Sequence, residues 1–204
     1  MNYKMYGSGC MEKLKKIPTS LPDIFIIEPT VFSDSRGFFY ESYNRRDMEL
    51  IGIRDNFVQD NQSCSAKGVV RGLHFQIRHP QGKLVRVLRG SIYDVVVDIR
   101  KGSPTFGKAI GFEISAQNFR MLWIPVGFAH GFLSLEDHTD VLYKTTDFYN
   151  PEYDAGIRWN DPDLAINWPL AQYGISSAII SEKDAKLPLL KEFESPFEYG
   201  DIPL

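Results

Sequence analysis

Short stretches rich in Val, Ile, Phe and Tyr recur along most of this chain. Gly, Pro, Asn and Asp separate them at intervals typical of β-sandwiches and barrels. A helical period is nearly absent, and only residues 45–51, with Asn44 as the expected N-cap, predict a helix. We therefore predict an all-β, jelly-roll β-sandwich with a few short helices. The predicted strands are residues 24–28, 37–43, 57–63, 69–76, 84–88, 91–99, 108–114, 121–124, 129–135 and 141–146.

The length and apolar content predict one domain over residues 1–204. A chain of 204 residues that is 43% hydrophobic has enough apolar side chains for one sizeable core. Residues 1–20 are expected to form a flexible leader, within which Met11 is a second candidate start. After Asn150, prolines and tryptophans interrupt the sequence at short intervals. We therefore expect residues 150–204 to wrap the core as a loop- and helix-rich segment.

Charge and composition exclude several classes of partner. The formal net charge is −3, which provides no general attraction for nucleic acid or an anionic membrane surface. No apolar stretch approaches the roughly 20 residues that a membrane helix needs. Cys10 and Cys64 lie far apart and match no metal-finger or disulfide framework, so we expect reduced thiols and a cytoplasmic protein.

A histidine lies within the apolar stretch at residues 69–76. Histidine is the side chain whose ordinary pKa best suits proton removal near neutral pH, so His74 is a candidate general base. A buried, hydrogen-bonded structural histidine is the alternative, and for a lone histidine it is the more common one.

Two further side chains share inward-facing positions with apolar neighbours. Lys83 alternates with Val85 and Val87, and Tyr143 alternates with Val141 and Thr145. Lys83 is a candidate to stabilise an oxyanion, and Tyr143 to supply a proton. A strand-end lysine reaching water and a packed core tyrosine are the alternatives.

Metal chemistry is the main rival, because metal-binding cupins present His-x-His and a nearby Glu on one strand and another His on a later one. The segment 125–130 matches the later motif, PxGxxH, and ends at His130. His74 is followed by Phe75 and Gln76, so the second histidine is missing, and so is the glutamate. With too few donors for a three-ligand site, we predict no metal and no cofactor.

An anionic ligand would need local cations, and several lie in or beside predicted strands: Arg36, Arg71, Lys83 and Arg100. Arginine forks suit the oxygens of a diphosphate. Phe39 and Tyr149 offer aromatic faces on which a nucleobase can stack.

Several longer segments carry a resemblance that covers most of the chain, from about residue 24 to 190. They are DSRGFFYESY (34–43), FVQDNQS (57–63), VVRGLHFQ (69–76), QGKLVRVLRGSIYDVVVDIRKGSPTFG (81–107), IPVGFAHGFLSL (124–135), YKTTDFYNPEYDAGIRWNDPDLAINWP (143–169) and ISEKD (180–184). In this order the chain resembles the dTDP-4-dehydrorhamnose 3,5-epimerases, a family of cupin-type sugar-nucleotide epimerases.

The resemblance implies a homodimer that acts on a dTDP-linked 4-keto-6-deoxy sugar in dTDP-L-rhamnose biosynthesis. It implies that His74 accepts a proton, Tyr143 donates one, Asp184 orients His74, and Lys83 binds the keto oxygen. It also places these residues around the nucleotide sugar, with Tyr149 stacked on the base: Arg36, Glu41, Gln59, Asn61, Arg71, His130, Tyr149, Asp154 and Lys183.

Strict alternation places Arg71 and His74 on opposite faces of their strand. Both serve one pocket only if Gly72 bends or bulges the strand, or if the pocket includes another chain.

A single-centre epimerase, a keto-isomerase and a non-catalytic sugar-binding cupin are the alternative functions. Finding all four predicted catalytic residues together argues against the last of these.

Overall fold

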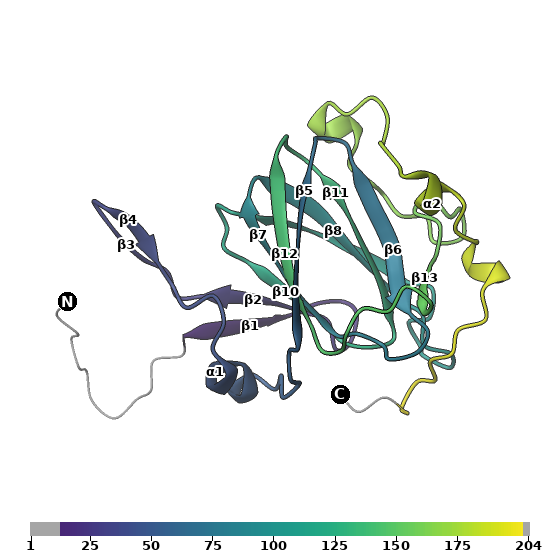
Figure 1. The fold of residues 1–204 in the computed structure, drawn as a ribbon, viewed down its shortest axis with the longest axis horizontal. Helices are drawn as coiled ribbons and strands as arrows, with labels where there is room; N and C mark the ends of the chain where they lie inside the picture. Colours follow the sequence, from purple (N-terminus) through teal and green to yellow (C-terminus); the bar gives the residue numbers. More distant parts are fainter. Residues whose placement is uncertain (1–12, 202–204) are drawn as a thin grey trace.

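Two antiparallel β-sheets face each other in the computed structural model, which describes residues 13–201 (Figure 1). One sheet has the order β1-β2-β10-β7-β12-β5 and the other β13-β6-β11-β8-β9. The predicted jelly-roll β-sandwich is thereby confirmed. The strands are β1 Leu14–Pro18, β2 Phe25–Pro29, β3 Phe32–Asp34, β4 Gly37–Phe39, β5 Gln59–Ser65, β6 Val70–Gln76, β7 Lys83–Arg89, β8 Ser91–Asp98, β9 Ala109–Ser115, β10 Met121–Ile124, β11 Phe128–Ser134, β12 Thr139–Thr145 and β13 Asp154–Gly156.

The main core lies between the two sheets, where alternate side chains point inward. Val85 and Val141 from the larger sheet meet Val96 and Phe132 from the smaller, and all are nearly inaccessible to solvent. Lys83 and Tyr143 continue the inward rows of β7 and β12. Alternation therefore sends these two polar side chains toward the space between the sheets.

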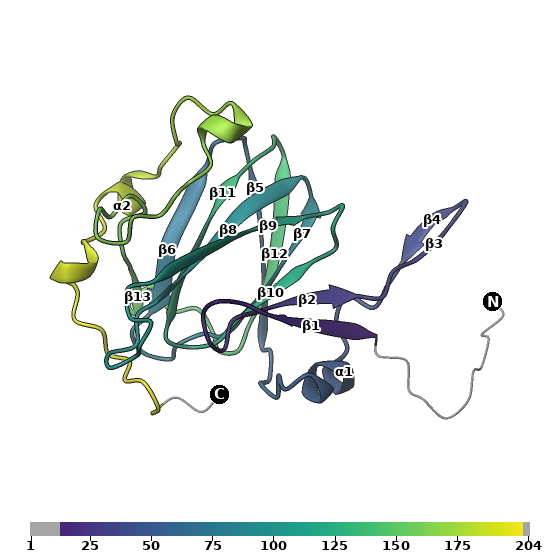
Figure 2. The same cartoon turned by 180° about the vertical axis from the view of Figure 1, so that it is seen from behind.

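The C-terminal segment covers the outer face of the smaller sheet, as Figure 2 shows from behind. Its apolar side chains pack on residues of β6 and β8: Leu164, Trp168, Leu190, Phe193 and Phe197. Its short helices are η1 Ala171–Tyr173, α2 Glu182–Ala185 and η2 Leu190–Glu192. The strand of this segment, β13, was not predicted, because three residues that include Asp154 and Gly156 have little β propensity and depend on pairing with β6.

Helix α1, Arg45–Leu50, covers part of the outer face of the larger sheet and buries Met48 against Leu84 and Trp123. The side chain of Asn44 accepts a hydrogen bond from the Arg46 amide, which confirms the predicted cap.

The N-terminal part differs from the sequence-based prediction in two places. Residues 14–18, within the expected flexible leader, form edge strand β1, whereas residues 1–12 lie outside the described residues. The predicted strand at 37–43 ends at Phe39 and pairs with β3 in a separate hairpin that projects from the body (Figure 1). On this hairpin Phe32, Phe38 and Phe39 are more than half exposed.

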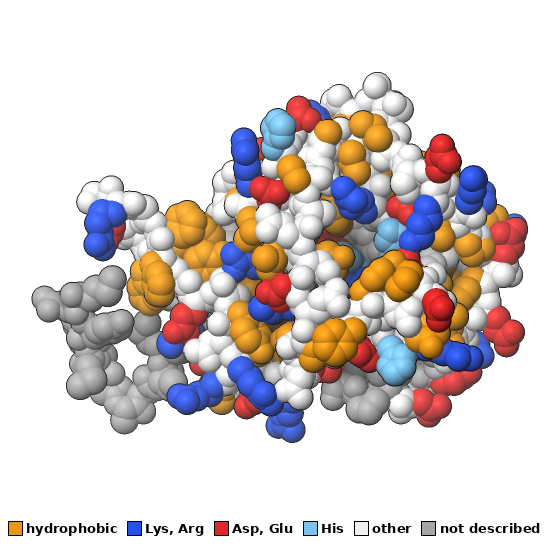
Figure 3. Space-filling view, in the orientation of Figure 1, with side chains coloured by type: hydrophobic (Ala, Val, Ile, Leu, Met, Phe, Trp, Pro, Cys, Tyr) orange, Lys and Arg blue, Asp and Glu red, His pale blue; other side chains and the backbone are white. Residues whose placement is uncertain are grey.

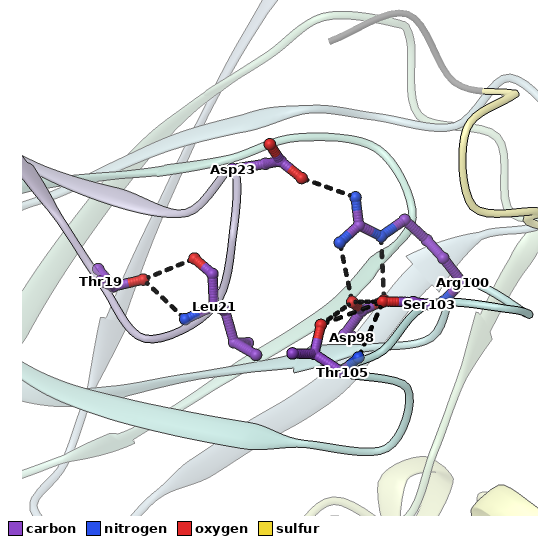
Figure 4. Close-up of polar contacts among 7 residues, drawn as sticks. All are labelled: Thr19, Leu21, Asp23, Asp98, Arg100, Ser103 and Thr105. Carbon is purple, nitrogen blue, oxygen red and sulfur yellow. Dashed lines mark hydrogen bonds and ion pairs between the residues drawn. The ribbon is translucent and has the colours of Figure 1, made fainter.

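A buried charge cluster lies at the end of β8 (Figure 4). The carboxylate of Asp98 accepts hydrogen bonds from Arg100 Nε and Nη2 at 3.0 and 2.8 Å, and from Ser103 Oγ and Thr105 Oγ1 at 2.7 and 2.6 Å. Arg100 Nη1 donates to Asp23 at 2.9 Å, which ties the β1–β2 connection to the cluster. The prediction of Arg100 as an anion ligand is therefore wrong, because its guanidinium is already paired and buried.

The helices found among residues 13–201 are all short, and none has the length and hydropathy of a membrane-spanning segment.

Candidate active site

A pocket of about 590 Å³ opens between β6 and β11 on one side and β7 and β12 on the other. The face drawn in Figure 3 is hollowed, and histidine, lysine and arginine side chains gather around the hollow. Nine of the thirteen predicted site residues line the pocket: Arg71, His74, Lys83, His130, Tyr143, Tyr149, Asp154, Lys183 and Asp184. A second hollow, beside Lys16 and Trp123, contains none of the thirteen.

The pocket contains both Arg71 and His74 because β6 does not keep strict alternation. Its pairing with β11 shifts register between the His130 and Phe132 positions, which is a β-bulge. Gly72 lies at this point with φ +122°, and a Cβ there would lie 2.5 Å from the Cα of Gly131. Only glycine fits this close approach of two backbones, so the expected bend at Gly72 is present.

His74 and Asp184 form a hydrogen-bonded dyad. His74 Nε2 lies 2.7 Å from Asp184 Oδ1, and the second carboxylate oxygen accepts the Gly72 amide at 3.2 Å. Ser181 caps α2 by accepting the Asp184 amide at 3.0 Å, which positions the carboxylate. Since Nε2 is occupied, Nδ1 is the ring nitrogen available to the pocket.

The dyad also sets the charge of the carboxylate. Burial opposes ionisation of Asp184, but hydrogen bonds from His74 and Gly72 and the nearby positive charges outweigh it, so its pKa lies below the usual range. Asp184 is therefore an anion at neutral pH, suited to orienting the imidazole and stabilising its protonated form.

Lys83 on β7 and Tyr143 on β12 come from the sheet that faces His74. The two strands are hydrogen-bonded neighbours, and Tyr143 lies opposite Val85. Burial lowers the pKa of the Lys83 ammonium to about 8, against the opposing attraction of Asp154 and Asp94. Lys83 Nζ lies 3.4 Å from the His74 carbonyl oxygen, which is a long contact. Burial also raises the pKa of the Tyr143 phenol, so it keeps its proton at neutral pH.

A second histidine dyad lies next to the first. His130 is directly opposite His74 on β11, and its Nε2 lies 2.7 Å from Asp94 Oδ1. Asp94 is fully buried, and its Oδ2 has no hydrogen-bond partner among the described residues. Asp94 was not among the residues predicted from the sequence, although an acidic residue inside the apolar stretch at 91–99 was a signal for it.

The mouth of the pocket is polar and aromatic. Tyr149 Oη donates to Asp154 Oδ2 at 3.3 Å, and Lys183 forms an ion pair with the same carboxylate. Gln59 and Asn61 lie on β5 outside the pocket lining but beside it: Gln59 Oε1 accepts the Tyr149 amide at 3.0 Å, and its Nε2 donates to Asn61 at 2.8 Å.

Arg36 and Glu41 do not lie in the pocket of their own chain. Arg36, at the tip of the projecting hairpin, pairs with Asp34, and Glu41 accepts hydrogen bonds from Lys13 and Asn44. Their predicted contacts with substrate stay predictions.

Among residues 13–201, no group of three or more His, Cys, Asp or Glu side chains is arranged to hold a metal ion. His74 and His130 are register partners on neighbouring strands, but each ring directs Nε2 at its own carboxylate. This donor set is the one expected for acid–base chemistry, with a base oriented by a carboxylate, a partly buried cation and a neutral phenol around one cavity.

Comparisons with known proteins agree with this chemistry. A family model described as dTDP-4-dehydrorhamnose 3,5-epimerase matches residues 18–192. The chain is 54% identical over 172 residues to the protein of that name from Pseudomonas aeruginosa, which covers 84% of this chain and 93% of that protein. It is 52% identical over 182 residues to that from Methanothermobacter thermautotrophicus, covering 89% of this chain and 97% of the relative.

Solved structures of sugar-nucleotide epimerases also superpose on this chain. The dTDP-6-deoxy-D-glucose-3,5-epimerase from Legionella pneumophila, in complex with dTDP-4-keto-L-rhamnose, superposes with a TM-score of 0.84 at 50% identity, over 89% of this chain and 95% of that one. A 3'-monoepimerase from Streptomyces bikiniensis, in complex with dTDP-quinovose, has a TM-score of 0.79 at 32% identity, over 86% and 87%.

Proposed function

Because this chain belongs to the dTDP-4-dehydrorhamnose 3,5-epimerase family, we propose that the pocket around His74 is where it performs the family's reaction. The protein is an isomerase that inverts carbons 3 and 5 of dTDP-4-dehydro-6-deoxy-D-glucose and forms dTDP-4-dehydro-L-rhamnose, a step of dTDP-L-rhamnose biosynthesis. The carrying observation is that His74, with its Asp184 partner, and Tyr143 line one cavity from opposite sheets.

His74 is the base in this proposal. A ketone at carbon 4 acidifies the hydrogens on carbons 3 and 5, and Nδ1 of His74 accepts one of them as a proton. The electron pair of the broken C–H bond moves onto the ketone oxygen and gives an enolate. Asp184 stabilises the imidazolium that forms.

Lys83 stabilises the enolate oxygen as a partly buried cation. A charged ammonium in a low-dielectric cavity interacts more strongly with a developing anion than it would in water. The ketone already supplies the electron sink, so the proposal requires neither a redox cofactor nor a metal.

Tyr143 returns a proton from the opposite side. It belongs to the sheet that faces β6, so its hydroxyl approaches the sugar ring from the face away from His74. Proton loss on one face and gain on the other inverts the configuration. Tyrosinate forms transiently and takes its proton back from the imidazolium through solvent.

The remaining pocket residues bind the nucleotide in this proposal. Arg71, Lys183 and His130 supply positive or hydrogen-bonding groups for the diphosphate and sugar, and Asp154 holds Lys183. Gln59 and Asn61 contribute polar groups beside the mouth. Tyr149, half exposed at the rim, offers its ring for stacking on thymine.

We also propose a homodimer in which the β3–β4 hairpin reaches the pocket of a second copy. The hairpin projects from the body, and apolar side chains gather on it and beside it (Figures 1 and 3). Exposed Phe38 and Phe39 favour burial against another surface, and Arg36 at the tip would then face the partner's nucleotide, with Glu41 at the hairpin base.

The proposed location is the cytoplasm, which suits the exposed thiol of Cys64.

Mixing two inactive variants tests this arrangement. Arg36→Ala and His74→Ala should each lose activity alone and regain part of it when co-refolded, because one site of a mixed dimer then has both residues. Absence of recovery, or a monomeric mass at micromolar concentration, would refute the shared site.

Conversion in deuterated water tests the reaction. Incubation with dTDP-4-keto-6-deoxyglucose should give product that carries deuterium at both carbon 3 and carbon 5. Label at one carbon after full conversion would indicate a single-centre epimerase. A moved carbonyl would indicate a keto-isomerase, and no exchange at all would indicate a sugar-binding protein without catalytic activity.

A further inference from the structure

We propose that Gln76 is the positioning residue that holds Tyr149 at the mouth of the pocket. Gln76 is the last residue of β6, two positions after His74, where a metal-binding cupin would have its second histidine. It has no assigned part in the reaction. The inference rests on the proposed function only in taking Tyr149 as the residue that stacks on the nucleobase.

The amide of Gln76 connects two loops through backbone groups alone. Its Nε2 donates to the carbonyls of His79 at 2.7 Å and Phe148 at 3.2 Å, and its Oε1 accepts the Asn150 amide at 2.7 Å. The side chain is 2% exposed, so these bonds form away from competing water. Gln76 thus holds the backbone on both sides of Tyr149.

Burial does not hold the Tyr149 loop, because Phe148 and Tyr149 are 63% and 50% exposed. Polar contacts do so instead: besides Gln76, Gln81 donates to the Asp147 carbonyl at 2.8 Å and Gln59 accepts the Tyr149 amide at 3.0 Å. Among these three glutamines, only Gln76 forms more than one hydrogen bond with the loop. Its two bonds, to Phe148 and Asn150, lie on either side of Tyr149.

The position requires a side chain that both donates twice and accepts. Glutamate at 76 would place a carboxylate oxygen against the two carbonyl oxygens, and methionine would leave the carbonyls and the amide unpaired. Alanine at Gln81 removes one hydrogen bond to the same loop and leaves the Gln76 contacts in place, so it is the matched control.

Binding of dTDP, measured by titration calorimetry, tests the proposal together with steady-state kinetics. Gln76→Glu and Gln76→Met should raise the Kd for dTDP and the KM about tenfold, as expected for losing a buried hydrogen-bond set. Their kcat should change much less, since the His74 dyad is untouched, and Gln81→Ala should have a smaller effect on Kd. If both Gln76 variants lower kcat while KM is unchanged, the proposal is wrong.

The Tyr149→Ala background separates positioning from general destabilisation. If Gln76 acts through Tyr149, Gln76→Met should weaken dTDP binding no further in that background. An equal further loss there would overturn the inference and leave the proposed reaction standing. Failure of the wild-type protein to exchange deuterium into substrate would instead overturn the proposed function.

Discussion

Two clusters in this molecule bury charged side chains, and they differ in whether the charges have partners. Around Asp98, both carboxylate oxygens accept several hydrogen bonds, and Arg100 is shared between Asp98 and Asp23 (Figure 4). At the pocket, Lys83 has one long contact of 3.4 Å, and Asp94, which is buried behind His130, has an Oδ2 atom without a hydrogen-bond partner among the described residues. Charges with full sets of partners stabilise the fold, whereas the Lys83 ammonium lines the pocket with spare hydrogen-bonding capacity and remains available to a substrate.

The pKa shifts follow the same difference. Burial opposes the charged forms of both Arg100 and Lys83. Paired carboxylates outweigh burial at Arg100 and raise its pKa, whereas burial prevails at Lys83 and lowers its pKa to about 8. The paired carboxylates therefore keep Arg100 charged, whereas burial leaves Lys83 with a pKa near enough to neutral that it can lose its proton.

The largest expected effect comes from the pocket. His74→Ala should reduce turnover by about 10²–10⁴-fold and abolish hydrogen exchange at the sugar, because no base remains to form the enolate. Coupled assays and NMR exchange measure both. His138→Asn, at an exposed turn with positive φ that asparagine tolerates, is the control that should retain activity. Undiminished exchange in His74→Ala would remove His74 from its role.

Asp98→Asn should affect stability and leave the chemistry intact. It removes the buried charge that pairs with Arg100 Nε and Nη2 and leaves only the Asp23 ion pair at Nη1, so the free energy of unfolding should fall by about 3–5 kcal/mol. The exposed Asp60, paired with Lys144, is the control, and Asp60→Asn should cost at most about 1 kcal/mol. Urea denaturation measures both, and a loss of kcat in folded Asp98→Asn protein would contradict the division between the clusters.

The same variant should change acid sensitivity. Burial disfavours the charged carboxylate of Asp98, but hydrogen bonds from Arg100, Thr105 and Ser103 outweigh it, so the folded pKa lies below the usual value. Its contribution to stability is therefore present above the unfolded pKa and is lost as the pH falls through the folded pKa. Asp98→Asn should lack that part of the acid dependence.

Tyr143→Phe should separate the two proton transfers. The base is still present, so exchange with solvent should persist, while product formation fails for lack of a donor on the opposite face. The ratio of deuterium wash-in to product formation measures this. Equal loss of both in a folded variant would mean that Tyr143 and His74 are not divided into donor and base.

Lys83 should give the protein a basic limb in its pH profile. The pKa is about 8, so kcat/KM should decline above that pH as the ammonium loses its proton. Lys83→Arg, which stays charged, should lack this limb whatever its absolute rate.

In thermal unfolding at pH 7, Lys83→Met should raise the Tm, because charged Lys83 is disfavoured by burial. A lower Tm would contradict the contrast with Asp98.

Chelation should have the smallest effect, namely none. Each pocket histidine directs Nε2 at a carboxylate, which leaves no cluster of donors for a divalent ion among the described residues. Activity after exhaustive treatment with EDTA measures this. Loss of turnover that zinc or manganese restores would show that the pocket uses a metal.

Much of the architecture was predictable because a buried sheet imposes a period of two on its residues. All ten predicted stretches overlap a strand, and inward positions such as Lys83 and Tyr143 followed from their apolar neighbours. Strands β1, β3 and β13 were missed because they are short or polar and exist through pairing with a neighbour. The end of β4 at Phe39 likewise depends on the hairpin partner.

By itself, then, the sequence determined the sandwich, the inward rows and, through motif resemblance, the family and nine residues that line one pocket. Other features became visible only in the folded molecule: the shift at Gly72 that brings Arg71 and His74 together, the Asp94 partner of His130, the two loops joined by Gln76, and the hairpin that holds Arg36 outside the pocket of its own chain. Alternation is a local property, encoded residue by residue, whereas these contacts join segments far apart in the chain. They depend on backbone positions that only the packed sheets define.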